Sequence, residues 1–223
     1  MNPKIININH NLLLYEKGDS VYNVVTYHSK YSFRAGVMDG TFLFKGRFQW
    51  NVLTNRRIVY ADPGNDQSFE NNEWTYTLHI FSLDTYERRV IHQKYEPLEL
   101  TEKQKSDEIS MFDNYPEELI SRMREFIEFR KSVFENAKYY DPFREILTDR
   151  NFIFVFTFRR DEEKGVLTYV IDADSGKHLS SVYFDTIPDY IRNGYAYILL
   201  HSGSRDEFPL IEKYKLDPAV YGK

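Results

Sequence analysis

The chain has 223 residues, of which 42% are hydrophobic, 28% are charged and 17% are aromatic, and this composition excludes an intrinsically disordered protein. The formal net charge of −5 excludes nucleic acid as the main ligand, because binding to phosphates requires a basic surface. The absence of cysteine excludes disulfides, thiolate metal sites and a cysteine nucleophile.

The amino-terminal residues 1–10 contain no continuous apolar segment, so we do not expect a signal peptide there. No stretch of the chain approaches the roughly 18 consecutive apolar residues of a membrane-spanning helix, and we expect no membrane span. The compartment in which the protein works stays open on these grounds.

Short apolar runs separated by turn residues fill the first hundred positions. They are rich in β-branched and aromatic residues, which favour strands, and Asp39-Gly40 is typical of a tight hairpin. Within these runs we expect Trp50 to lie in the core and Trp74 to be more exposed. The predicted strands span 12–15, 21–27, 31–37, 41–44, 48–53, 57–61, 75–83 and 88–92.

The pattern changes to helical periodicity between about 101 and 138. Thr101 and Gln104 have the spacing of a capping box, which predicts a short first helix. Pro116, followed by two glutamates, predicts the start of a longer amphipathic helix. We therefore expect a helical insertion that docks on the sheets, with a helix that binds a partner as the alternative.

Strands resume after the insertion. Asp172 and Asp174 resemble the start of a calcium loop, but the remaining ligands are missing, so the segment is interpreted as a hairpin turn. The predicted strands span 144–147, 151–159, 167–172, 179–184, 190–192, 195–201 and 211–216.

An internal repeat connects these strands. The segments 51–60, 144–154 and 189–198 each contain a short strand, a turn at Asn or Asp, and a strongly apolar strand. A later strand then ends near Asp84, Asp174 or Asp217. A four-stranded unit that recurs at roughly 40–50 residues is typical of a β-propeller blade, and a β-sandwich is the alternative.

The chain resembles the six-bladed β-propeller proteins of the NHL-like group, which are widespread in bacteria. The resemblance is carried by residues 55–61, 80–84, 95–103, 187–197 and 214–216. It implies an all-β fold of four-stranded antiparallel blades, and related propellers are often exported.

The chain is short for six blades. We expect one propeller-like domain over 1–223 with about four blades, interrupted by the helical insertion at about 101–138. An incomplete blade would precede residue 46, and two blades would follow at about 47–97 and 143–186. The last blade, after 187, would again be incomplete. Open blade edges favour self-association.

The repeated turns provide the candidate ligand-binding residues. Arginines recur there, and on one face of a propeller they would form a basic rim beside aromatic residues, which suits carboxylate or sugar recognition. The alternative is that these side chains pair with neighbouring acidic residues. The candidates are Arg56, Arg57, Arg150, Tyr190 and Arg192.

No catalytic motif accompanies these residues. No histidine pair has the spacing of a helical metal site, and a nucleophile elbow and a phosphate-binding loop are both missing. We therefore predict no catalytic residue, metal or cofactor, although whether the protein is an enzyme stays open. The leading hypothesis is a non-catalytic binding or scaffold module for a protein or small molecule. The alternatives are a metal-dependent hydrolase or lyase with its site over the central channel, or a partial propeller without independent activity.

Overall fold

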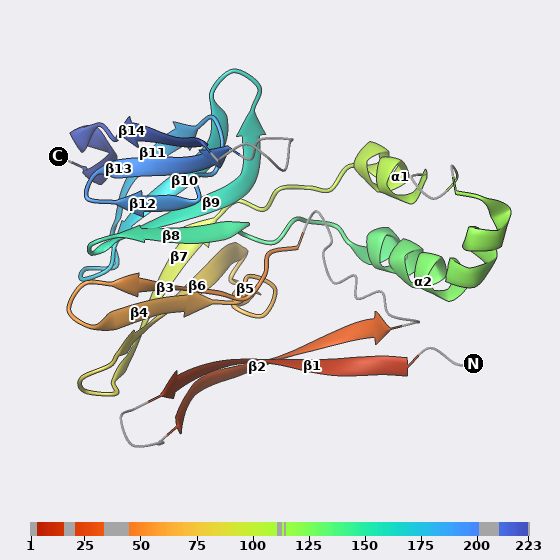
Figure 1. The fold of residues 1–223 in the computed structure, drawn as a ribbon, viewed down its shortest axis with the longest axis horizontal. Helices are drawn as coiled ribbons and strands as arrows, with labels where there is room; N and C mark the ends of the chain where they lie inside the picture. The colour runs from red at the N-terminus through yellow and green to blue at the C-terminus, as the bar shows by residue number, and fades with distance from the viewer. Residues whose placement is uncertain are drawn as a thin grey trace. The chain divides into compact units, whose positions relative to one another are not determined.

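The computed structural model describes residues 4–15, 21–33, 45–110, 113, 115–200 and 210–222 (Figure 1). The chain divides into two compact units. Unit 1 comprises Met1–Lys45 and Leu98–Tyr140, and unit 2 comprises Gly46–Pro97 and Asp141–Lys223. Antiparallel sheets dominate, which confirms the predicted mainly-β class, but the described residues form no closed propeller. Among the described residues, no helix is long and apolar enough to cross a membrane.

Unit 1 contains a long hairpin. Its strands are β1 (Lys4–Tyr15) and β2 (Val21–Phe33), which pair antiparallel along their length. The prediction of separate strands at 21–27 and 31–37 is wrong, because residues 28–30 continue the ladder opposite residues 7–9. The backbone makes this pairing, and it continues through these positions. The predicted strand 41–44 and the turn at Asp39-Gly40 lie outside the described residues.

Two helices of unit 1 form the predicted insertion. They are α1 (Glu102–Ser110) and α2 (Glu117–Asn136). The Gln104 backbone N–H donates to Thr101 Oγ1 over 3.2 Å, and the Thr101 N–H donates to Gln104 Oε1 over 2.9 Å. These reciprocal bonds confirm the capping box.

The base of the insertion is closed by a short antiparallel bridge. The Leu100 N–H donates to Lys138 O, and the Tyr140 N–H donates to Leu98 O, each over 2.9 Å. Leu100 also packs with Phe134 of α2 in a small buried cluster. The two ends of the helical insertion are therefore held side by side by these hydrogen bonds.

The first sheet of unit 2, sheet 1, is a four-stranded meander with one extra strand. Its strands are β3 (Gln49–Leu53), β4 (Arg57–Ala61), β5 (Gln67–Glu70), β6 (Glu73–Ser82) and β7 (Arg88–Tyr95). The order is β3-β4-β6-β7, with β5 beside the beginning of β6. The strand β5 is not predicted, because its four residues have little apolar pattern.

Two further meanders follow. Sheet 2 consists of β8 (Glu145–Asp149), β9 (Phe152–Asp161), β10 (Gly165–Asp172) and β11 (His178–Phe184). Sheet 3 consists of β12 (Tyr190–Arg192), β13 (Tyr195–Leu200) and β14 (Leu210–Lys215), and a short 3-10 helix, η2 (Pro218–Tyr221), follows it. In both sheets, strands that are adjacent in sequence pair with each other.

One backbone hydrogen bond recurs in all three sheets. In each sheet, the residue that follows the third strand of the repeat (β6, β10 or β14) donates its backbone N–H to a carbonyl oxygen in the sheet's first hairpin turn. The N···O distance is 2.8 Å in all three. The pairs are Leu83 with Arg56, Ala173 with Asn151, and Leu216 with Gly194. Each donor directly precedes one of the recurrent aspartates noted in the sequence. The sequence repeat thus corresponds to a repeated structural unit.

The sheets pack face to face in chain order. One buried cluster joins sheet 1 to sheet 2 and contains Leu78, Ile80, Ile153 and Val155. The other joins sheet 2 to sheet 3 and includes Phe154, Phe156, Ile191 and Ala196. Alternate residues of β9 enter the two clusters, so sheet 2 is buried on both faces.

The two tryptophans do not lie as expected. Trp50 is 53% exposed on the edge strand β3, so the prediction of a core position is wrong. Leu53, on the opposite face of β3, packs in the core instead. Trp74 is half-buried, with its ring centroid 5.0 Å from that of Phe69 and 6.1 Å from that of Tyr95.

Candidate functional site

The first hairpin turns of the three sheets lie next to one another at one end of unit 2, which we call the turn end. The Thr54 N–H donates to Arg150 O over 3.1 Å and joins the turns of sheets 1 and 2. The Asn193 N–H donates to Asp149 Oδ1 over 2.6 Å and joins those of sheets 2 and 3. The turns are tight: Arg56, Arg150 and Asn193 all have positive φ.

Polar side chains also join the first strands of sheets 1 and 2. The Gln49 side-chain amide donates to Arg144 O over 2.5 Å and accepts from the Ile146 N–H over 2.6 Å. Thr148 Oγ1 donates to Val52 O over 2.7 Å. These bonds pair backbone N–H and C=O groups of the two edge strands, which would otherwise lack a partner where the two sheets meet.

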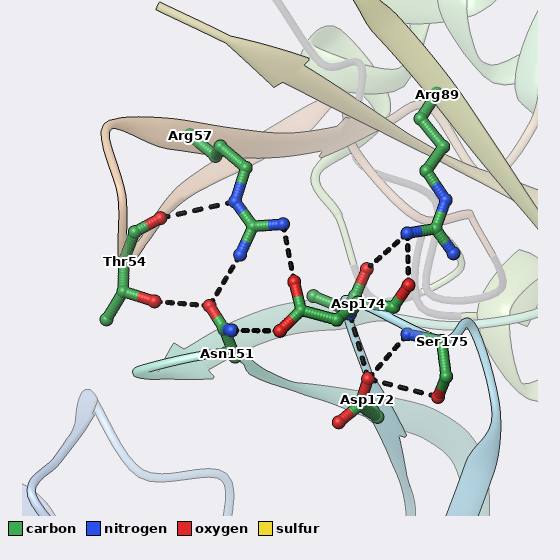
Figure 2. Close-up of polar contacts among 8 residues, drawn as sticks. Thr54, Arg57, Arg89, Asn151, Asp172, Asp174 and Ser175 are labelled. Atoms are coloured by element: carbon green, nitrogen blue, oxygen red, sulfur yellow. Dashed lines mark hydrogen bonds and ion pairs between the residues drawn. The ribbon is translucent and has the colours of Figure 1, made fainter.

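Arg57 is the centre of a network at the turn end (Figure 2). Its guanidinium donates to Asp174 Oδ1 over 2.7 Å, to Asn151 Oδ1 over 2.6 Å and to Thr54 O over 3.3 Å. Asn151 bonds in turn to both Thr54 and Asp174. The Arg57 side chain is only 17% exposed. We call these four residues the Arg57 network.

The turn between β10 and β11 holds Asp174 in place. Asp172 Oδ1 accepts from the Ser175 N–H over 2.6 Å and from the Asp174 N–H over 2.8 Å. The bond from the Ser175 N–H is the main cause that lowers the pKa of Asp172. Arg89 donates to the carbonyls of Ala173 and Asp174 (Figure 2). The prediction that this segment is a hairpin turn is confirmed.

Asp149 plays the joining role between sheets 2 and 3. It is 2% exposed, and its two oxygens accept from the Asn193 N–H over 2.6 Å, the Gly194 N–H over 2.8 Å and the Tyr221 hydroxyl over 2.7 Å. Burial raises the pKa of Tyr221, and the bond to Asp149 adds to the rise, so the phenol stays a donor at neutral pH.

The four arginines among the five candidate residues fall into two groups. Arg56 forms an exposed ion pair with Asp84, with Nε 2.5 Å from Oδ1, and Arg57 belongs to the network above. Arg150 and Arg192 are exposed, and their side chains form no hydrogen bond or ion pair with another described residue. Tyr190 is 46% exposed, and its ring centroid lies 6.3 Å from that of Tyr197.

Unit 2 also contains hydrogen-bonded acids away from the turn end. The Asp66 Oδ1 atom lies 3.0 Å from His79 Nε2, and the Tyr60 ring stacks on His79 at 5.0 Å. Asp141 is buried and accepts from the Gly46 N–H over 2.9 Å. In the part of the chain that the structure describes, no three His, Asp or Glu side chains are grouped as a metal site.

Sequence reasoning missed the residues that make the junctions. Asp174 is predicted only as a turn residue, and Asp149 and Asn151 lie within the recurrent segment 144–154 without being singled out. Their signal was present, because Asn or Asp recurs at each turn and an Asp follows each third strand. The hydrogen bonds between these residues could not be predicted from the sequence, because partners such as Arg57 and Asp174 are far apart in the chain.

The chain matches no known family model, and neither the curated proteins nor the solved structures include a significant match to it.

Proposed function

We propose that this protein is a non-catalytic binding module whose turn end receives a carboxylate-bearing ligand through Arg150 and Arg192, with Tyr190 beside them. The observation that carries the proposal is that Arg150, in the first turn of sheet 2, and Arg192, directly before the first turn of sheet 3, have no ion-pair partner among the described residues. A planar guanidinium binds a carboxylate through two parallel hydrogen bonds.

The turns are fixed before any ligand arrives. Arg150 lies in a turn whose carbonyl accepts from Thr54, and Arg192 precedes a turn held by Asp149. Because each of these turns is held by a hydrogen bond to a neighbouring sheet, binding would order only the side chains. A site of this kind loses less conformational entropy on binding than one on a mobile loop.

The proposal includes a β-propeller architecture. Three observations support it: the sheets are meanders, they pack face to face in series, and their first strands β3, β8 and β12 adjoin at the turn end.

Calorimetric titration with citrate at low ionic strength tests the binding site. We expect binding that weakens about tenfold or more when both arginines are replaced, as in R150Q with R192Q, because charged hydrogen bonds contribute about 1.5–3 kcal/mol. The matched control is R56Q, which removes an arginine from the same end that already has a partner. Equal loss in R56Q, or binding of a neutral oligosaccharide instead of citrate, would contradict the proposal.

A further inference from the structure

Sheet 3 has a face that points away from sheet 2, and we call it the outer face. Ile191 and Ala196 point towards sheet 2, so the alternate residues of each strand lie on the outer face. Strand register arranges them in cross-strand rows. The rows are Arg192–Tyr195–Lys215, Tyr190–Tyr197–Lys213 and Leu199–Ile211.

The first two rows carry three cations and no carboxylate. Among the described residues, none of Arg192, Lys213 and Lys215 forms an ion pair. Lys213 Nζ instead lies 4.0 Å from the ring centroid of Tyr195 and 5.7 Å from that of Tyr197. The third row is aliphatic, and Ile211 is 63% exposed. On a protein of net charge −5, this face is a local basic and aromatic surface.

The outer face occupies the position of a face that is buried one repeat earlier. Residues of β8, β9 and β10 correspond to those 43 positions later in β12, β13 and β14 with identical strand register. Leu147 pairs with Phe154 as Tyr190 pairs with Tyr197, and Val170 pairs with Phe154 as Lys213 does with Tyr197. In sheet 2 this face packs against sheet 3.

The equivalent positions keep the aromatic rings but change their polarity. Phe152 and Phe154 correspond to Tyr195 and Tyr197, so each ring gains a hydroxyl. Asp149 corresponds to Arg192. The carboxylate that accepts from the backbone N–H groups of the next sheet is thus replaced by a guanidinium, which can only donate. Asp172 corresponds to Lys215 by the same offset.

We propose that the outer face of sheet 3 is a docking surface for an acidic polypeptide segment that carries both carboxylates and aliphatic side chains. Its carboxylates would bind Arg192, Lys213 and Lys215, and its aliphatic side chains would pack on Leu199 and Ile211. A charged partner suits a surface that must stay soluble when unoccupied, and electrostatic attraction would speed the encounter.

This inference deepens the proposed binding function and rests on it for the role of Arg192 alone. Lys213 and Lys215 lie on β14 and are not part of the proposed carboxylate site of the turn end. Variants of these lysines therefore test the docking surface separately from variants of Arg150.

The experiment measures fluorescence anisotropy of a labelled peptide of alternating glutamate and valine, added to the full chain at low ionic strength. We expect binding that weakens about tenfold or more in the double variant K213Q/K215Q, and that weakens with added salt. The matched control is K164Q, since Lys164 also lies over an exposed tyrosine ring, 5.7 Å from the centroid of Tyr183. An unchanged thermal unfolding curve would show that each variant folds.

Several results would overturn the inference. They are equal affinity in K213Q/K215Q, equal affinity for a glutamine–valine peptide, tighter binding of heparin through the same lysines, and a dimer in light scattering that K213Q/K215Q dissociates. Loss of peptide binding in K213Q/K215Q with retention in R150Q supports the docking surface. If the R150Q/R192Q pair leaves citrate binding unchanged while that pattern holds, the turn-end proposal alone fails.

Discussion

At the junction between sheets 1 and 2 an arginine joins the turns, whereas at the junction between sheets 2 and 3 a carboxylate does. Arg57 binds Asn151 and Asp174 across the first junction, and Asp149 binds the backbone of Asn193 and Gly194 across the second. The first junction uses its arginine, and the second leaves Arg192 without a described partner. The two junctions thus separate arginines that bond across a junction from Arg150 and Arg192, which have no described hydrogen-bond or ion-pair partner and which we propose bind a ligand.

Removal of Asp149 should give the largest effect on stability. In D149A two backbone N–H groups and the Tyr221 hydroxyl lose a buried acceptor, and we expect a loss of about 3 kcal/mol or more in the free energy of unfolding. Urea denaturation measures it. D84A is the control, because Asp84 is exposed; an equal loss in both variants would show that the second junction does not depend on the buried carboxylate.

Removal of Arg57 should give the next largest effect. R57A leaves Asp174 and Asn151 without their shared donor, and we expect a loss of about 2 kcal/mol. R57K should recover only part of it, since an ammonium group cannot reproduce the planar fork of donors. Full recovery in R57K, measured by urea denaturation, would show that charge alone matters at the first junction.

A smaller effect with the opposite sign is expected at Glu145 on β8. Burial raises the pKa of Glu145; Arg144 opposes the rise and Asp189 adds to it. Because the pKa is higher in the folded state than in the unfolded one, the protonated form favours folding at low pH, and this contribution is lost as pH rises through the folded-state pKa. E145Q should therefore raise the melting temperature at neutral pH and not at a pH below the unfolded-state pKa. A gain that is independent of pH would contradict this cause.

The smallest effect should come from Arg56. The Arg56 side chain is 71% exposed and that of Asp84 56%, so R56A should change the free energy of unfolding by less than about 1 kcal/mol. Thermal unfolding at low and high salt checks it. A loss as large as that of R57A would place Arg56 among the joining residues.

Local features of the fold could be predicted from the sequence. The capping box at Thr101, the strands of sheets 2 and 3 and the turn at Asp172 depend on neighbouring residues, and the structure shows all of them. Trp50 was misplaced because an aromatic residue on a strand can occupy either face. Only the sheet order reveals that β3 is an edge strand.

The candidate site could be predicted in part. The recurrence of arginine at the turns pointed to one end of unit 2, where the structure brings the three turns together. The sequence could not show which arginines bond across a junction and which have no partner, because this depends on contacts between different sheets, such as that of Arg57 with Asp174.

NMR titration of the arginine Nε–Hε signals with citrate distinguishes the two groups of arginines directly. We expect the signals of Arg150 and Arg192 to shift together with one affinity, while those of Arg56 and Arg57 stay unchanged. A shift at Arg57, or shifts at Arg150 and Arg192 with different affinities, would contradict the division between joining and available arginines.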